Sequence, residues 1–411
     1  MKIFNRKLKI TSSALLTLCM VFVMTACAEN SSQSEKSQPA EQTTVQPTTM
    51  SAEEINDRKL DKFISDMTLE EKVGQMFFVR CPDEDAVQQV SKYNIGGYIL
   101  FGRDFDGKTK DEVVDDIHSY QNEADIPLLI GVDEEGGTVV RVSSNPNLRE
   151  TPFLSPKDIY ADGDWDAVKQ DAEEKADLLL SLGINVNLAP VCDMTSDEYG
   201  FMYDRSFSSD VDMENRYVRT VVETSKSKKL GTVLKHFPGY GNNSDTHTGI
   251  AYDDRDYSEF ENTDFKPFHQ GIESGADCIL VSHNIVNCMD SKYPASLSQK
   301  VHDILRNEFK FDGVIMTDDL IMDAITDFTG DEAAAVTAAK CGNDLLCCSS
   351  VDTQYPAVLE AVQNGEISEA EVDASVKRIL KWKQNLGIFN IDTYQKKVKS
   401  TEPTDTVGSE E

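Results

Sequence analysis

The chain has 411 residues and a formal net charge of −32 at pH 7. A surface this acidic repels a phosphate backbone, so the composition argues against nucleic acid as a partner and favours solubility. Residues 1–26 hold four basic and no acidic side chains, so the chain without them is near −36.

The N-terminus has the pattern of a bacterial secretory signal. Four basic residues fall among the first nine, an apolar run covers residues 14–24, and small residues lead into Cys27. This run of about eleven residues is shorter than the ~20 needed to cross a bilayer, which argues against a transmembrane anchor. The pattern is similar to a lipoprotein signal in which Cys27 becomes the lipidated first residue. We therefore expect an extracytoplasmic chain, lipid-anchored to the bacterial cell membrane.

Composition divides the rest of the chain into three segments. Residues 27–54 are rich in Ser, Gln, Thr and Pro and lack an apolar period, which predicts a flexible stalk. Residues 55–395 are globular in composition and no Pro/Ser linker interrupts them, which predicts one domain. Residues 396–411 are charged and lack an apolar period, so we expect a disordered tail.

Metal and nucleotide sites find little support in the sequence. Seven cysteines follow Cys27 without a CxxC pair, so we interpret them mainly as small buried hydrophobic residues, with a stray disulfide as the alternative. Residues 102–109 match a P-loop pattern, but Asp104 and Asp106 would face the phosphates. Residues 162–173 echo an EF-hand loop without its glycine. We therefore expect no metal and no cofactor.

The first element of the predicted domain is a helix that begins after Thr68, because Thr68 and Glu71 have the spacing of a capping box. Short apolar runs then recur, most of them separated by amphipathic stretches that end near a glycine. The runs predicted to be strands are residues 75–79, 97–101, 128–132, 185–191, 232–234, 277–281, 312–316 and 343–347. The clearest helical stretches are residues 168–182, 214–230, 266–274 and 333–340.

Eight strand–helix units with nearly continuous apolar strands predict a parallel sheet covered by helices. Eight such units in about 340 residues fit a closed barrel better than an open doubly wound sheet, which remains the alternative. We therefore predict an α/β fold, a (β/α)₈ TIM-type barrel with a single catalytic domain.

Polar residues follow six of the predicted strands, and in this fold the carboxyl ends of the strands form the active site. These residues are Arg103, Asp133, Asp193, Lys235, His236, His283, Asp318 and Asp319. One acid or histidine after a strand is unremarkable, because loops are polar. A set from six strands predicts one catalytic pocket.

Residues 235–249 form the stretch that is densest in chemically active side chains. The stretch begins with Lys235 and His236, turns at a Pro-Gly pair, and contains Asp245 and His247 near its end. An aspartate two residues from a histidine can orient the ring and make it more basic, as a general acid/base requires. A polar surface turn with two incidental histidines is the alternative.

Two further strand ends carry candidate groups. Asp318 is suited to act as the nucleophile of glycosyl transfer, although capping of the next helix is an alternative role that Asp319 could also fill. Asp133 precedes a double glycine that lets the backbone approach a ligand, and Arg141 lies eight residues on. Asp133 could accept hydrogen bonds from sugar hydroxyls, with an ordinary acidic turn as the alternative. Arg205 supplies a second arginine after the fourth strand.

Five motifs, spread in order over nearly the whole globular part, resemble glycoside hydrolase family 3 and specifically its β-N-acetylglucosaminidase (β-hexosaminidase) branch. They are MTLEEKVGQ (67–75), VDEEGGTVVR (132–141), DRSF (204–207), KHFPGYGNNSDTH (235–247) and GVIMTDDL (313–320). The fourth motif is highly specific and the others are moderately so. In that motif Tyr240 stands where the family more often has His, and the loop that follows looks one residue short.

The resemblance implies that Asp318 is the nucleophile and that His247, paired with Asp245, is the general acid/base. It also implies a set of residues that bind the terminal sugar, namely Asp133, Arg141, Arg205, Lys235 and His236. The chain ends soon after the eighth unit, so we expect it to lack the second domain of many family 3 β-glucosidases. In that case the loop itself must supply the acid/base.

The function implied is that of a retaining exo-β-N-acetylglucosaminidase, which cleaves terminal non-reducing β-linked GlcNAc from peptidoglycan fragments or related oligosaccharides through a covalent glycosyl-Asp intermediate. A β-N-acetylglucosaminide phosphorylase or a broader β-glycosidase is an alternative. A non-catalytic sugar-binding lipoprotein is an alternative of another class, against which the intact Asp318, Asp245 and His247 argue. The expected partners are an oligosaccharide or muropeptide substrate and the membrane, and we expect a monomer.

Overall fold

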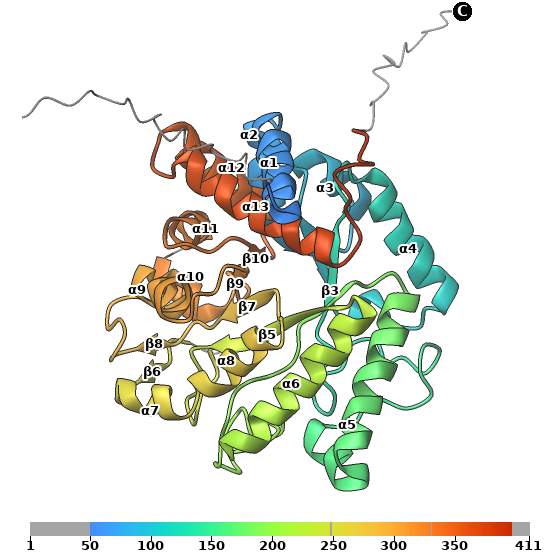
Figure 1. Ribbon diagram of the computed structural model, residues 1–411, viewed down its shortest axis with the longest axis vertical. Coiled ribbons are helices and arrows are strands. Elements are labelled where there is room, and N and C mark those ends of the chain that lie inside the picture. Colours follow the sequence, from blue (N-terminus) through green and yellow to red (C-terminus); the bar gives the residue numbers. More distant parts are fainter. Residues whose placement is uncertain (1–49, 247–248, 330, 397–411) are drawn as a thin grey trace, which may run out of the picture. The chain divides into compact units, whose positions relative to one another are not determined.

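Eight parallel strands form the centre of the structure (Figure 1). They are β1 (Phe77–Arg80), β2 (Gly97–Leu100), β3 (Leu129–Val132), β4 (Val186–Asn187), β5 (Gly231–Phe237), β7 (Cys278–Val281), β9 (Val314–Thr317) and β10 (Leu346–Cys348). Their order in the sheet is β10-β1-β2-β3-β4-β5-β7-β9. A parallel bridge between Met316 and Leu345 joins the two ends of this order. The sheet is therefore a barrel, as predicted, and not an open sheet.

The structure is a computed structural model that describes residues 50–246, 249–329 and 331–396, and its compact unit begins at Ser51. Cys27 and His247 lie outside the described residues, as does nearly all of the predicted tail. The first helix, α1, spans Ala52–Ser65 and is capped by the side chain of Ser51. The last three residues of the predicted stalk, 52–54, therefore belong to a helix.

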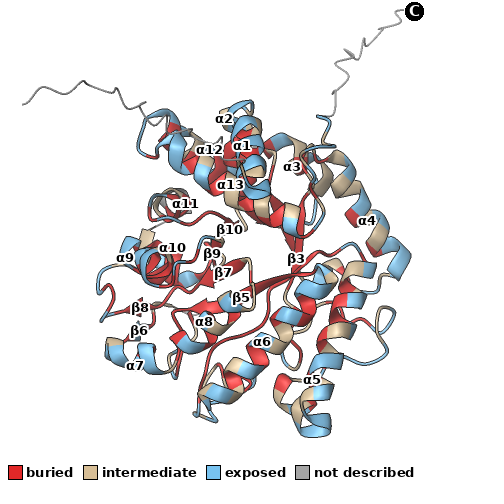
Figure 2. Ribbon diagram, in the orientation of Figure 1, coloured by how far each residue is buried: buried red, intermediate tan, exposed pale blue. Residues whose placement is uncertain are grey.

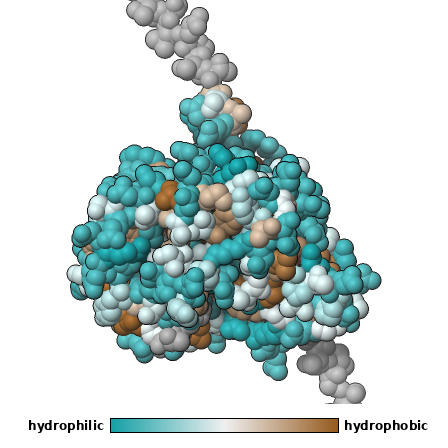
Figure 3. Space-filling view, turned by 90° about the horizontal axis from the view of Figure 1, so that it is seen from below, coloured by the Kyte–Doolittle hydropathy of each residue, from teal (hydrophilic) through white to brown (hydrophobic). Residues whose placement is uncertain are grey.

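Helices connect successive strands and surround the barrel. The outer helices are α3 (Ala86–Tyr93), α4 (Lys110–Glu123), α5 (Pro156–Ser181), α6 (Val211–Lys228), α7 (Tyr257–Asn262), α8 (Phe265–Glu273), α9 (Gln299–Asp303), α10 (Asp323–Thr329), α11 (Asp331–Lys340) and α12 (Val351–Gln363). Their inner faces are buried against the strands and their outer faces are exposed (Figure 2). The surface seen in Figure 3 is accordingly mostly hydrophilic, with hydrophobic patches that are small and scattered.

The connections after β5 and β7 carry extra short elements. A two-stranded parallel sheet joins β6 (Tyr252–Asp253) to β8 (Ile285–Val286). The short helical turns η3 (Ala295–Leu297) and η4 (Ile304–Glu308) also follow β7, and a further turn, η1 (Gly102–Asp104), follows β2. No helix within the described ranges has the length and apolar character that crossing a bilayer requires.

Helix α2 (Leu69–Gln75) leads directly into β1 and starts with the predicted capping box. The Thr68 hydroxyl accepts the Glu71 N–H at 3.2 Å, and the Glu71 carboxylate accepts the Thr68 N–H at 2.9 Å. Helix α13 (Glu369–Asn385) contributes Ile379 and Trp382 to the apolar cluster inside the barrel, and Leu386, which caps its C-terminus, belongs to the same cluster. Bulky side chains thus fill the barrel interior, and polar chemistry is confined to its ends.

The cysteines agree with the sequence interpretation in six cases out of seven. Those six are buried, and all seven described cysteines are free thiols. Cys288 is the exception, because it is exposed and does not belong to the core.

Candidate active site

A cavity of about 500 Å³ opens at the carboxyl ends of the barrel strands. Seven residues singled out in the sequence line this cavity: Asp133, Arg141, Arg205, Lys235, His236, Asp318 and Asp319. The structure brings these seven residues together, as the strand-end pattern predicts. The polar residues that line it can hold an uncharged, hydroxyl-rich ligand by hydrogen bonds.

The alternation of side chains along each strand explains why they converge. Successive residues of a strand point to opposite faces. Four residues that pack inside the barrel are Phe78, Ile99, Val233 and Met316. The residues two positions further on, which line the cavity, are Arg80, Phe101, Lys235 and Asp318. The inward face of each strand therefore changes from apolar to polar or aromatic at the mouth of the barrel.

The ammonium group of Lys235 is the centre of a buried charge cluster. Its Nζ lies 2.6 Å from Asp133 Oδ1 and 2.6 Å from Glu135 Oε1. Burial would lower the pKa of Lys235, but the two carboxylates more than offset burial and raise the pKa above its ordinary value. Lys235 is therefore a permanent cation that fixes the orientation of Asp133. Lys235 and His236 lie within β5, which continues to Phe237 and so extends beyond the predicted strand.

Glu135 holds the second cation of the cluster. Nε and Nη2 of Arg205 donate to its two carboxylate oxygens at 3.0 and 2.8 Å. Burial would raise the pKa of Glu135, but Arg205 and Lys235 keep it well below the usual range. Glu135 is thus ionised, and it ties the loop after β4 to the end of β5.

Glu135 was not among the predicted site residues, because it stands beside Glu134 in an acidic run. The two glutamates have different roles. The Glu134 carboxylate is buried and accepts the backbone N–H groups of Arg141 and Val142 at 2.9 and 2.7 Å. The signal that distinguishes them is strand alternation, because Glu135 lies two positions after Asp133 and shares its face.

His236 is held between Arg205 and Asp193. Arg205 Nη2 lies 3.2 Å from His236 Nε2, and Asp193 Oδ2 lies 2.7 Å from His236 Nδ1. A guanidinium group can only donate, so Nε2 accepts and Nδ1 carries the proton that is donated to Asp193. Asp193 is fully buried and does not line the cavity. It orients the imidazole from behind.

Asp318 and Asp319 follow β9 but differ in their surroundings. Asp318 lines the cavity, and its carboxylate accepts the Asp319 N–H at 2.9 Å. The Asp319 carboxylate accepts the Ser349 hydroxyl at 2.6 Å and the Ile321 N–H at 3.2 Å. Burial raises the pKa of Asp319, partly offset by these hydrogen bonds. Asp319 therefore holds the turn that presents Asp318, and His283 supports the same turn through the Asp319 carbonyl at 3.1 Å.

The loop after β5 contains the remaining predicted residues. Asp245 is half-buried and is not among the described residues that line the cavity. Thr246 is buried, and His247 lies outside the described residues. Tyr240 is buried at the start of this loop, where its N–H donates to Asp193 at 2.7 Å and its ring contacts the ring of His236. The aspartate that orients His236 therefore also fixes the start of the loop.

Arg103 does not join the cavity, contrary to the strand-end prediction. Its side chain pairs with Asp83 at 2.7 Å and donates to the carbonyl of Cys81. The reason is that Phe101, and not Arg103, continues the inward face of β2. Sequence reasoning missed Arg80 as well as Phe101, although both continue an inward-facing apolar position.

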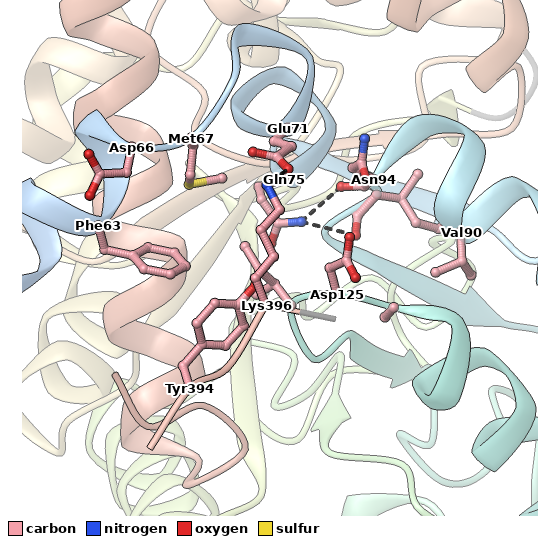
Figure 4. Close-up of a pocket in the computed structure, with 13 residues that line it drawn as sticks. Phe63, Asp66, Met67, Glu71, Gln75, Val90, Asn94, Asp125, Tyr394 and Lys396 are labelled. Atoms are coloured by element: carbon pink, nitrogen blue, oxygen red, sulfur yellow. Dashed lines mark hydrogen bonds and ion pairs between the residues drawn. The ribbon is translucent and has the colours of Figure 1, made fainter. Parts of the chain in front are cut away.

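A second cavity of about 230 Å³ lies at the opposite end of the barrel, beside the segments that lead into β1, β2 and β3 (Figure 4). Its walls are largely apolar, and Gln75 spans one side by donating to the carbonyls of Asn94 and Ile95 at 2.8 and 3.3 Å. Among the described residues no group of three His, Cys, Asp or Glu side chains has the arrangement of a metal site. The polar chemistry thus concentrates at the carboxyl end.

Comparison with known proteins agrees with this arrangement. The sequence model described as "Glycosyl hydrolase family 3 N terminal domain" matches residues 68–382. The chain is 32% identical over 273 residues to a beta-hexosaminidase of Nitrosomonas eutropha, and the aligned region covers 64% of this chain and 77% of that protein. It is 31% identical over 286 residues to a beta-hexosaminidase of Hydrogenovibrio crunogenus, and that aligned region covers 68% of this chain and 79% of the relative.

A solved structure gives the same result for the fold. A glycoside hydrolase family 3 beta-N-acetylglucosaminidase from Paenibacillus sp. str. FPU-7 superposes with a TM-score of 0.74 at 29% identity. The match covers 84% of this chain and 66% of that chain, which is just under two thirds of its length. Because the family match extends over more than half of the sequence, this protein belongs to glycoside hydrolase family 3 and is an enzyme of that family.

Proposed function

We propose that the protein is a retaining exo-β-N-acetylglucosaminidase that acts on terminal, non-reducing β-linked GlcNAc. The observation that carries the proposal is the position of Asp318 in one cavity with Asp133, Arg205, Lys235 and His236. The beta-hexosaminidase names of the matched relatives support the same sugar class. A terminal sugar fits a cavity of about 500 Å³ that is closed at its base by the barrel core.

In the proposed first step, a carboxylate oxygen of Asp318 attacks the anomeric carbon and the bond to the leaving oxygen breaks. His247, oriented by Asp245, gives its proton to that oxygen. In the second step His247 takes a proton from water, and the water oxygen displaces Asp318 from the anomeric carbon. Two displacements on opposite faces retain the β configuration.

The charge cluster gives the other residues their proposed roles. Asp133 presents a carboxylate that Lys235 holds in place, so it can accept hydrogen bonds from two sugar hydroxyls. Arg205 and Lys235 keep donors free for other oxygens of the sugar, because Glu135 neutralises their charge without using all of their N–H groups. Arg141 and His236 complete the proposed set of sugar-binding side chains.

The natural substrate is proposed to be a peptidoglycan fragment or a related oligosaccharide. Phosphorolysis is a second candidate reaction, since a histidine acid/base repels an incoming phosphate less than a carboxylate would. A non-catalytic sugar-binding role is opposed by the exposure of the Asp318 carboxylate to the cavity.

Turnover of an aryl β-GlcNAc glycoside tests the proposal. We expect Asp318→Asn to abolish release of the aryl group and His247→Ala to reduce it by about 10²–10⁴-fold, the usual contribution of a general acid/base. Asp327→Asn is the matched control, because Asp327 is exposed on α10. Full activity of Asp318→Asn would overturn the assignment. An aryl glucoside that is cleaved faster than the GlcNAc compound would favour a broader β-glycosidase.

We further propose that Cys27 carries a lipid that anchors the protein to the outer face of the bacterial membrane. The supporting feature is the basic, apolar and small-residue pattern that precedes Cys27. Cys27→Ala should move the protein from the membrane fraction to the soluble secreted fraction. Membrane association that survives this change would exclude the lipid at Cys27 as the anchor.

A further inference from the structure

Two arginines share one aromatic ring in the wall of the active-site cavity. The guanidinium carbon of Arg80 lies 4.4 Å from the centre of the Phe101 ring, and that of Arg141 lies 5.7 Å from it. All three side chains line the cavity. Stacking on an aromatic face orients a guanidinium group while leaving its in-plane N–H groups available for a ligand.

These two cations differ from the other two in the same cavity. Arg205 and Lys235 are neutralised by Glu135 and Asp133 at distances of 2.6 to 2.8 Å. Within the described ranges, neither Arg80 nor Arg141 forms an ion pair, and the Nε of each is buried without a hydrogen-bond partner. One wall of the cavity therefore holds two guanidinium groups that no carboxylate among the described residues neutralises and that have N–H groups without an acceptor.

The scaffold fixes this wall before any ligand arrives. Arg80 is the last residue of β1, and Phe101 directly follows β2, which pairs with β1. The loop that bears Arg141 is pinned by the buried Glu134 carboxylate through the Arg141 and Val142 N–H groups. Donors on rigid elements bind without a large ordering cost.

We propose that Arg80 and Arg141, stacked on Phe101, form an oxyanion-binding subsite of the substrate cavity. The ligand is a carboxylate or phosphate group, because planar guanidinium donors match two oxygens of such a group. This inference rests on the proposed function, since it adds an anionic group to the sugar that the cavity binds. With a net charge of −32, the protein repels anions at long range, so an anionic substrate needs unpaired cations at the site itself.

Two sources of the oxyanion can be separated by experiment. In the first arm, the full-length enzyme is given a GlcNAc-β-1,4-GlcNAc disaccharide and the same disaccharide with a carboxylate-bearing ether on the reducing sugar. In the second arm, inorganic phosphate is titrated, with GlcNAc-1-phosphate as the product to detect. The variants are Arg80→Met, Arg80→Lys and the control Arg103→Met, whose arginine pairs with Asp83 outside the cavity.

In the first arm, the quantity compared is kcat/KM for the carboxylate-bearing disaccharide divided by kcat/KM for the neutral one. In the second arm, it is the apparent affinity for phosphate. We expect Arg80→Met to lower one of these two quantities about tenfold, which corresponds to about 1.4 kcal/mol. Arg80→Lys should recover part of this loss, which excludes misfolding as its cause, and Arg103→Met should match the wild type. A loss confined to the first arm names the substrate carboxylate as the ligand, and one confined to the second names free phosphate.

The subsite is overturned if Arg80→Met leaves both quantities at their wild-type values. Phosphate binding is also measured by calorimetry, which needs no turnover. Phosphate binding that depends on Arg80 in a protein that cleaves neither disaccharide would support the subsite and contradict the proposed hydrolase function. The two hypotheses can therefore fail independently.

Discussion

The hydroxyl of Tyr240 lies 2.5 Å from the hydroxyl of Thr246, and both residues are buried. This hydrogen bond spans the loop that follows β5 and joins its start to the residue directly before His247. Tyr240 is itself fixed by the bond from its N–H to Asp193. Tyr240 is therefore one of the residues that hold the described part of this loop together.

Tyr240→Phe should weaken catalysis more than binding. The change removes only the hydroxyl, so the ring still packs against His236 while Thr246 loses its partner. We expect kcat for an aryl β-GlcNAc substrate to fall by about tenfold with KM nearly unchanged, because loss of one hydrogen bond of about 1 kcal/mol loosens the chain next to the proposed acid/base.

Tyr98→Phe is the matched control for that change. Its hydroxyl donates to the carbonyl of Ala86 at 2.6 Å, on the outer side of β2 and away from the cavity. It should lower the free energy of unfolding by a similar amount and leave kcat unaltered. Equal kinetic effects of the two variants would mean that the Tyr240 hydroxyl has no specific role in the loop.

Glu135→Gln should destabilise the fold and depress activity together. The change leaves Arg205 and Lys235 with one negative partner fewer, and breaking a buried ion pair costs about 3–5 kcal/mol. The pKa of Glu135 is lower in the folded state than its ordinary value of 4.5, so its contribution is fully present above about pH 4.5. The stability that Glu135 contributes is lost as the pH falls from there through the pKa of Glu135 in the folded state.

Denaturant unfolding of wild type and Glu135→Gln between pH 7 and pH 3 checks this sign. The difference in unfolding free energy should stay constant from pH 7 to about pH 5 and shrink on further acidification. Glu150→Gln, which changes an exposed glutamate, should show little difference at any pH. A gap between wild type and Glu135→Gln that widens in acid would show that Glu135 is not stabilised as an anion.

Lys383 should make the fold less stable at neutral than at alkaline pH. This lysine of α13 is fully buried, donates to Gln75 Oε1 at 2.7 Å, and has its pKa lowered by burial from 10.5 to about 7. Between about pH 7 and pH 10.5, folding therefore releases a proton. The resulting loss of unfolding free energy grows as the pH falls from 10.5 to 7 and is constant below that, with a full size of about 5 kcal/mol.

Unfolding measured at pH 7 and pH 10 tests that sign. Lys383→Met should remove most of the pH dependence that the wild type shows in this window. Lys381→Met is the control, because Lys381 lies on the same helix but is partly exposed and pairs with Asp57 at 2.7 Å. This variant should retain the pH dependence of the wild type. The same pH slope in wild type and Lys383→Met would mean that Lys383 is charged in the folded protein.

The barrel was predictable because its information is local. Each observed barrel strand overlaps a predicted apolar run, and a parallel strand buried on both faces must be apolar along its whole length. The ends of the strands were less predictable. β5 continues through Lys235 and His236, since Asp133 and Glu135 pair with the Lys235 ammonium group and Asp193 accepts the ring N–H of His236.

The site was predictable where a residue type stands out and not where a pairing decides its role. Asp133 and Asp318 follow apolar runs and are predicted from the sequence. Strand alternation places Glu135 on the face of Asp133, but only its pairing with Arg205 in the structure shows what Glu135 does there. Arg80 ends a strand with no motif around it. Its significance appears only when Phe101 from the next strand lies beneath it.

Gly239→Ala should damage both the fold and the site, because the backbone here leaves no room for a side chain. Gly239 has a φ of +121°, and a Cβ placed on it would lie 2.2 Å from Asp264 Oδ1. That carboxylate cannot retreat, since Arg255 binds it at 2.9 and 3.1 Å and also donates to the Gly239 carbonyl at 3.0 Å. The loop must therefore shift away from β5 to accept the methyl group.

Gly107→Ala separates this steric effect from backbone strain alone. Gly107 also has a positive φ, +72°, but no atom lies within 4 Å of a Cβ built there. We expect Gly107→Ala to cost about 1 kcal/mol of unfolding free energy with full activity. Gly239→Ala should cost more than about 3 kcal/mol and lower kcat/KM about 100-fold, as a misplacement of about 1 Å can do. If urea unfolding and kinetics gave the same values for both variants, the contact between Gly239 and Asp264 would not be what positions the loop.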